Sequence, residues 1–116
     1  MLPIKKLKAG TVIFTEGSPD KTMFIIIEGS VKIYSIQHGN EVEISVLHEH
    51  EFFGEIEMFR NKPRSVSAKA LTDVRLVYIK NRMQLDQFIG QTPEFSGKMV
   101  RLMGERLAHA SAAAEL

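Results

Sequence analysis

The chain has 116 residues, of which 44% are hydrophobic and 25% charged, and its 15 basic and 14 acidic residues leave a formal net charge of +1. This length and composition are typical of one globular domain. The near-neutral charge argues against a dedicated nucleic-acid binder, which would carry a basic surface. The absence of cysteine excludes disulfides, thiolate metal sites and cysteine nucleophiles. It also fits a reducing compartment, so we expect a cytoplasmic protein.

The first residues predict no targeting or membrane segment. Lys5 and Lys6 are followed by mixed sequence, whereas a signal peptide would continue with an apolar run. The longest unbroken apolar stretch, residues 23–27, is far too short to span a bilayer. We therefore expect no association with a membrane.

Residues 1–80 are predicted to form strands. Residues 41–46 alternate charged or polar side chains with apolar ones, which is the period of a half-buried strand. Residues 24–27 have no polar gap, so that strand is predicted to be buried on both faces. Turn signals rich in glycine separate the runs, at residues 9–10, 16–20, 28–30 and 38–40. Many short strands at this spacing predict a mainly β fold, an antiparallel sandwich or jelly roll.

The pattern changes after residue 80, where two C-terminal helices are predicted. Asn81 is a suitable N-cap for a short helix to Ile89, with Gly90 ending it. Thr92-Pro93-Glu94 then marks the start of a second helix. The apolar residues of this second helix form one stripe at helical spacing: Phe95, Met99, Leu102, Met103, Leu107 and Ala110. The expected organisation is one domain over residues 1–116, with a β-roll over about 1–80 and C-terminal helices over about 81–113.

The segment from residue 52 to residue 68 carries the candidate chemistry. A short helical turn is expected at residues 55–59, and the N-terminus of a helix presents unpaired N–H groups that attract anions. Gly54 permits close approach of the backbone, and the guanidinium of Arg64 can fork onto phosphate oxygens. Glu55 is an acceptor of the kind that a sugar hydroxyl needs. Together these residues predict a site for a sugar phosphate.

The same segment resembles the phosphate-binding cassette of the cyclic-nucleotide-binding domain family, which includes catabolite activator effector domains and kinase regulatory subunits. That cassette reads Phe-Gly-Glu and, after a short insert, Pro-Arg followed by small residues. Phe53-Gly54-Glu55 and Pro63-Arg64-Ser65 match it. The resemblance also covers residues 10–33 and the closing helix, so it spans nearly the whole chain. It implies an eight-stranded β-roll with a short cassette helix and a closing C-terminal helix.

The resemblance implies a regulatory, non-catalytic domain that binds a cyclic nucleotide, with cyclic AMP favoured over cyclic GMP, and that signals by moving its C-terminal helix. It implies no metal and no resident cofactor. It assigns ligand-binding roles to eight residues: Gly54, Glu55, Ile56, Glu57, Arg64, Ser65, His109 and Ser111. The first two would hold the ribose hydroxyl, the next four would hold the cyclic phosphate, with residues 56 and 57 acting through their amides, and the last two would lie at the base. The apolar stripe of the last helix makes a homodimer a further expectation. No helix-turn-helix follows, so we expect no direct nucleic-acid binding by this chain.

Two residues depart from the family pattern. Glu57 stands where the family usually has alanine or glycine, and a carboxylate near the phosphate is a like-charge penalty, unless it points outward toward Arg60 or Lys62. His50 stands where the family commonly has a turn glycine, and histidine tolerates positive φ better than most residues.

Two alternative functions remain open. His48, His50 and Glu55 imitate the metal motif of a cupin-like enzyme, although no neighbouring strand supplies a third histidine. Glu57 favours a degenerate scaffold, with the same fold, no ligand and a role in protein contacts. Metal content would identify the first alternative, and the lack of a ligand-dependent melting shift would identify the second.

Overall fold

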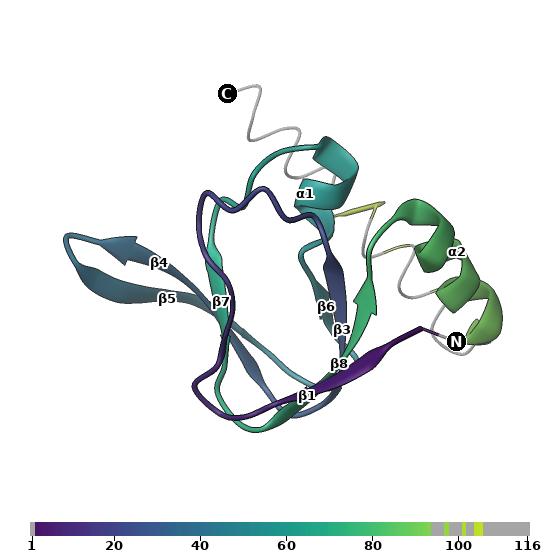
Figure 1. The fold of residues 1–116 in the computed structure, drawn as a ribbon, viewed down its shortest axis with the longest axis horizontal. Helices are drawn as coiled ribbons and strands as arrows, with labels where there is room; N and C mark the ends of the chain where they lie inside the picture. Colours follow the sequence, from purple (N-terminus) through teal and green to yellow (C-terminus); the bar gives the residue numbers. More distant parts are fainter. Residues whose placement is uncertain (1, 94–96, 98–100, 102–103, 106–116) are drawn as a thin grey trace.

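The computed structural model describes residues 2–93, 97, 101, 104 and 105, and these residues build two antiparallel sheets. The first sheet contains, in spatial order, β1 (Ile4–Leu7), β8 (Val74–Ile79), β3 (Met23–Glu28) and β6 (Phe52–Phe53), as Figure 1 shows. The second contains β2 (Val12–Phe14), β7 (Ser67–Ala70), β4 (Val31–Gln37) and β5 (Asn40–Leu47). The predicted mainly β jelly roll is therefore confirmed.

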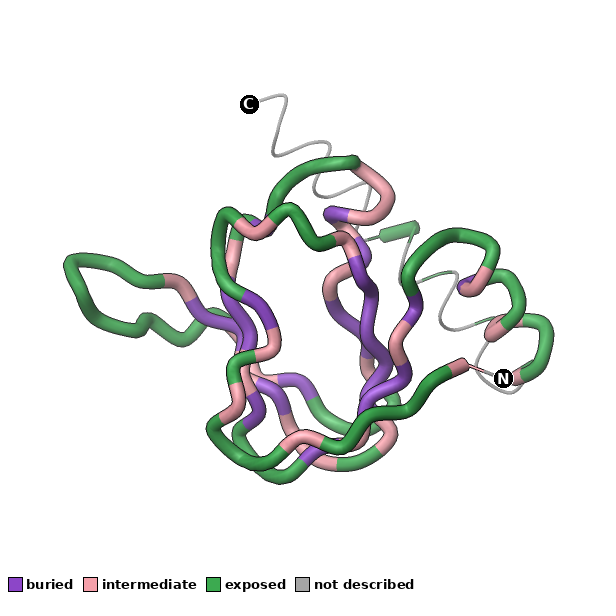
Figure 2. Tube along the Cα trace, viewed as in Figure 1, coloured by how far each residue is buried: buried purple, intermediate pink, exposed green. Residues whose placement is uncertain are grey.

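The main hydrophobic core lies between the two sheets, where alternate side chains of each strand point inward. Phe24 and Ile26 of β3 contribute from the first sheet, and Val31 and Ile33 of β4 contribute from the second. Figure 2 shows the buried segments gathered where the two sheets face each other. Burial of these apolar side chains stabilises the roll.

Strand β3 is buried on its outer face as well, because helix α2 (Arg82–Gln91) covers that side of the first sheet. Met23 and Ile25, which alternate with the core residues of β3, belong to a second apolar cluster that includes Leu85 of α2. The prediction that this strand is buried on both faces is thus confirmed for residues 24–26, whereas Ile27 at the end of the run is only half-buried.

Helix α2 begins as predicted and ends later than predicted. The side chain of Asn81 accepts a hydrogen bond from the Gln84 amide at 2.9 Å, which is the expected N-cap. Gly90 does not end the helix, because its backbone stays helical and Thr92 provides the cap, with its hydroxyl donating to the Phe88 carbonyl at 2.6 Å. Of the second predicted helix, residues 93, 97, 101, 104 and 105 are helical, while its apolar stripe lies outside the described residues. No helix in the described part of the chain is long and apolar enough to cross a membrane.

The β4–β5 hairpin projects beyond the body of the roll (Figure 1). Its turn is made by His38 and Gly39, which both have positive φ. Three of its apolar side chains, Ile36, Val42 and Ile44, are exposed, and Figure 2 shows the tip as exposed chain. The inner halves of β4 and β5 contribute to the candidate site described next.

Candidate functional site

The turn between β6 and the short helix α1 (Glu55–Arg60) is built around Gly54. This residue has a φ of 84°, a backbone conformation that glycine adopts without steric cost. A Cβ here would lie 2.8 Å from the Thr22 carbonyl oxygen and 3.0 Å from Nη1 of Arg64. The sequence therefore needs glycine at this point both for its backbone angle and for the close approach of two neighbours.

A cavity of about 470 Å³ opens beside this turn, within the usual size range of small-ligand sites. Both sheets line it, together with the start of α1 and the loop before β7. The lining residues are Phe14, Ile33, Ser45, Leu47, Phe53, Gly54, Glu55, Ile56, Glu57, Ser65 and Val66. Five of the predicted ligand-binding residues, Gly54, Glu55, Ile56, Glu57 and Ser65, thus line the same cavity.

Arg64 lies beside this cavity but is held inside the protein, with only 2% of its surface exposed. Its backbone is fixed by the connection between β2 and β3, since its N–H donates to the Ser18 carbonyl at 2.9 Å and its carbonyl accepts from the Gly17 N–H at 2.8 Å. Its guanidinium lies against Gly54 and is not among the groups that line the cavity.

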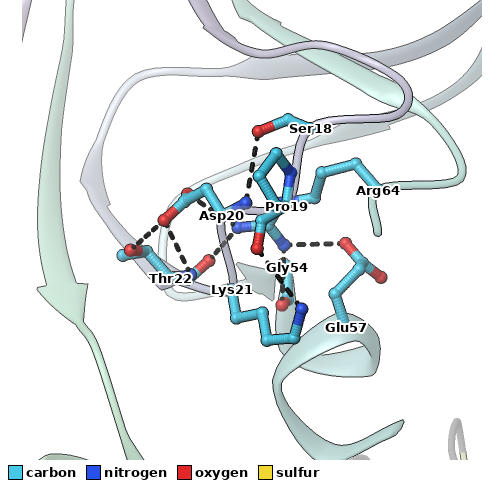
Figure 3. Close-up of polar contacts among 8 residues, drawn as sticks. All are labelled: Ser18, Pro19, Asp20, Lys21, Thr22, Gly54, Glu57 and Arg64. Carbon is cyan, nitrogen blue, oxygen red and sulfur yellow. Dashed lines mark hydrogen bonds and ion pairs between the residues drawn. The ribbon is translucent and has the colours of Figure 1, made fainter. Parts of the chain in front are cut away.

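The guanidinium of Arg64 is paired within the protein through both terminal nitrogens (Figure 3). Nη1 donates to the Gly54 carbonyl at 2.9 Å and to Oε1 of Glu57 at 2.7 Å. Nη2 donates to Oδ2 of Asp20 at 3.1 Å and to the Thr22 carbonyl. Nε is buried and has no hydrogen-bond partner among the described residues. One donor of this arginine is therefore unsatisfied, which for a buried polar group is an uncommon condition.

An aromatic surface supports the guanidinium from the core side. Its Cζ lies 4.1 Å from the ring centroid of Phe14 and 6.0 Å from that of Phe24. Phe24 in turn stacks on Phe53 with centroids 5.0 Å apart. A desolvated guanidinium over an aromatic ring is a favourable arrangement, and here it fixes the charge between strands of the two sheets.

The Arg64 environment also shifts the titration of Asp20. Burial raises the pKa of Asp20, but hydrogen bonds from Thr22 and Arg64, together with the positive charge of Arg64, outweigh that effect and hold the pKa below its ordinary value of 3.8. Asp20 is therefore ionised at neutral pH and remains an electrostatic partner of Arg64.

Glu57 does not point outward, as one reading of the sequence allowed. Its side chain is only 7% exposed and pairs with Arg64. The physical reason is that Glu57 follows Gly54 by three residues, which on the first turn of α1 places it over the guanidinium. A buried carboxylate needs such a partner, and the buried guanidinium of Arg64 supplies it.

The histidines are arranged differently from a cupin metal site. His50 adopts a φ of 71°, so the predicted positive φ is confirmed. Nδ1 of His48 lies 3.0 Å from the Ser30 hydroxyl in a separate shallow pocket. In the described part of the chain, no three His, Asp or Glu side chains converge as a metal-binding group. The structure therefore does not bring His48, His50 and Glu55 together.

Sequence reasoning did not identify Asp20, Thr22 and Phe14 as neighbours of the site. Asp20 belongs to a predicted turn and lies 44 residues from Arg64, and no local spacing connects the two. The pairing of β2 with β7 and of β3 with β6, together with the backbone hydrogen bonds between Arg64 and residues 17 and 18, brings these segments together. His109 and Ser111, predicted to lie at the base, are outside the described residues.

Curated proteins of known function match much of the chain. A cyclic AMP-activated global transcriptional regulator of Mycobacterium tuberculosis, similar to catabolite activator proteins, is 35% identical over 99 residues, which is 84% of this chain. The chain spans only 44% of that regulator's length. A cyclic nucleotide-gated potassium channel of Mesorhizobium japonicum is 30% identical over 112 residues, which is 97% of this chain and 30% of the channel.

Solved structures share the fold. An EAL enzyme with cyclic AMP bound superimposes with a TM-score of 0.69 at 28% identity, over 97% of this chain and 30% of the enzyme chain. The catabolite activator protein of Thermus thermophilus, at 23% identity, superimposes with a TM-score of 0.73 over 98% of this chain and 54% of its own. The sequence profile of the cyclic nucleotide-binding domain matches residues 4–91. This chain therefore belongs to the cyclic nucleotide-binding domain family.

Proposed function

We propose that this chain binds a cyclic purine nucleotide in the cavity beside α1, as a regulatory module without catalytic activity of its own. The observation that carries the proposal is the position of Arg64, which is buried beside the cavity near Gly54, Glu55 and Ser65 and whose Nε has no partner among the described residues. A buried donor without a partner is suited to a phosphate oxygen, since hydrogen bonds to charged acceptors are strong.

The remaining lining groups suit the rest of such a ligand. The carboxylate of Glu55 would accept a hydrogen bond from the ribose hydroxyl, and the hydroxyl of Ser65 would donate to the cyclic phosphate. Apolar walls at Phe14, Val66 and Leu47 offer a surface for the sugar and base. Cyclic AMP is favoured over cyclic GMP because the mycobacterial regulator is cyclic AMP-activated, although one solved form of the EAL enzyme contains cyclic GMP.

The output of the module is also part of the proposal. Ligand in the cavity would favour one position of the helix that follows residue 93, in the manner of a two-state switch. The proposed recipients are a second copy of the chain, through the apolar stripe of that helix, or another domain or subunit.

Calorimetric titration tests the binding proposal, with cyclic AMP, cyclic GMP and the non-cyclic 5′-monophosphate as a control. We expect micromolar affinity or better for a cyclic nucleotide and, at 100 times the dissociation constant, a stabilisation of about 2.7 kcal/mol. The proposal would be overturned if millimolar cyclic nucleotide produced no binding heat and no shift in melting temperature.

A ligand-free scaffold is the second candidate, and one observation favours it. Arg64 already has carboxylate partners in Glu57 and Asp20, so the fold satisfies its terminal nitrogens without a ligand. The same titration separates the two functions, because a scaffold would give no heat with any nucleotide.

A further inference from the structure

Two carboxylates hold Arg64, and they do so from different surroundings. Glu57 is 7% exposed, accepts from Nη1 at 2.7 Å and is part of the cavity wall. Asp20 is 49% exposed, accepts from Nη2 at 3.1 Å and does not line the cavity. Of the two carboxylates, only Glu57 both accepts from the guanidinium and lines the space that a ligand would enter.

The wall of this cavity is acidic. Glu55 and Glu57 both line it, and none of the described residues that line it carries a positive side chain. Arg64 is a cation beside it, and two carboxylates already face its single charge. A phosphodiester that enters must approach a carboxylate in a poorly solvated region, where repulsion between like charges is much stronger than in water.

The internal hydrogen bonds of Arg64 leave few N–H donors for a phosphate. Each terminal nitrogen already donates two hydrogen bonds, to Gly54 and Glu57 or to Asp20 and Thr22. Among the described residues these bonds leave Nε as the one donor without a partner, so a phosphate can form the stronger two-nitrogen fork only by displacing an internal partner. Two of these partners belong to residues that line the cavity, Gly54 and Glu57, and of the two only Glu57 has a side chain that can move away.

Building on the proposed function, we propose that Glu57 is an internal competitor of the ligand phosphate for Arg64. Its carboxylate occupies the position on the guanidinium that the phosphate requires, and it thereby sets the affinity of the site for anionic ligands. In the empty protein the same contact satisfies the buried charge, so the domain remains folded without ligand. Glu57 thus determines how much free nucleotide is needed to occupy the site.

The test is calorimetric titration of cyclic AMP into the wild-type chain, Glu57→Gln and Asp20→Asn. Both variants remove one negative charge from a partner of Arg64, and both keep an oxygen that can accept its hydrogen bond. We expect Glu57→Gln to bind about tenfold more tightly or better, a gain of about 1.4 kcal/mol. Asp20→Asn should change affinity by less than about threefold, because it is half exposed and does not face the ligand.

Other outcomes would overturn the proposal in distinguishable ways. If the wild-type chain binds and Glu57→Gln binds equally or more weakly, Glu57 positions Arg64 rather than competing for it, and the binding function still holds. An equal gain in affinity for both variants would mean that the loss of one negative charge, and not the release of Arg64 from Glu57, strengthens binding. If none of the three proteins binds, the competitor and the binding function both fail. Thermal unfolding without ligand checks that each variant is folded, and Glu57→Ala, which should also tighten binding, replaces Glu57→Gln if the latter is not folded.

Discussion

At the scale of single residues, the site depends on Gly54, where neighbouring atoms lie closer to the backbone than a side chain would allow. Gly54 brings the backbone against the Thr22 carbonyl and the Arg64 guanidinium, and it does so with a positive φ. The arginine then connects the loop before β3, the turn before α1 and the aromatic core. Arg64 therefore stabilises the empty fold in addition to its proposed role in binding.

Substitution of Gly54 by alanine measures this close approach. The control is Gly39→Ala in the β4–β5 turn, where φ is similar at 81° but nothing lies within 4 Å of the added Cβ. Gly39→Ala should cost about 1–2 kcal/mol from backbone strain alone. Gly54→Ala should cost about 1–3 kcal/mol more, because the methyl group overpacks its neighbours. Denaturant unfolding gives both values, and equal losses would contradict the packing argument.

The lowered pKa of Asp20 predicts that the free energy of unfolding decreases at acidic pH because this carboxylate becomes protonated. A carboxyl group whose pKa is lower in the folded chain stabilises the fold fully above its ordinary value of 3.8, and the contribution is lost as the pH falls through the lowered value. The stability advantage of the wild-type chain over Asp20→Asn should therefore shrink below this pH. Unfolding free energies across that range are the measurement.

The control for this pH series is Asp86→Asn, since Asp86 is exposed on α2. Its stability difference from the wild-type chain should stay nearly constant over the same range. If the stability differences of the Asp20 and Asp86 variants change equally with pH, the ion pair with Arg64 does not cause the loss of stability at acidic pH.

The residues that line the site could be predicted from the sequence only where they belong to one short motif. The turn from Phe53 to Glu55 and the return at Arg64 are local in sequence, and each lies at the cavity or beside it. Whether they bind a nucleotide is still a prediction. The pairing of Arg64 with Asp20 and Glu57 could not be predicted, because it depends on strand pairing between distant segments and on the orientation of one side chain.

At the scale of elements, helix α2 is the part that covers the outer face of the first sheet. Its cap at Asn81 was predictable from side-chain chemistry. Its end was not, since Gly90 is a permitted helix stop but not an obligatory one, and Thr92 caps the helix instead, with its hydroxyl donating to the Phe88 carbonyl and its N–H to the Ile89 carbonyl. A cap signal thus predicts the start of this helix better than a glycine predicts its end.

Two truncations on α2 test how the helix is held. Leu85 is 4% exposed and packs in the cluster with Met23 and Ile25, whereas Met83, two residues earlier, is 72% exposed. Leu85→Ala should cost about 2–5 kcal/mol of stability, as expected for a buried leucine. Met83→Ala should change stability by less than about 0.5 kcal/mol. Chemical unfolding measures both, and a small loss for Leu85→Ala would mean that α2 is not docked on the sheet.

At the scale of the whole molecule, the fold was largely predictable because turn signals and alternation are periodic along the chain. The unbroken run at residues 24–27 predicted a strand covered on both faces, and the structure supplies the opposite sheet on one side and α2 on the other. The order of strands within the sheets could not be obtained in this way. It follows from contacts between segments as distant as β1 and β8.

The complete burial of the Arg64 side chain has a consequence for how the domain responds to ionic strength. Mobile ions screen exposed charges over a Debye length that falls from about 30 Å at 0.01 M salt to about 3 Å at 1 M, but they screen buried pairs far less. Over this range the affinity for cyclic nucleotide should therefore change by less than about threefold. Titrations in sodium chloride would reveal a steeper loss if exposed lysines held the phosphate instead. If the proposed binding holds, the occupancy of this site should follow the concentration of nucleotide and should depend little on the salt concentration.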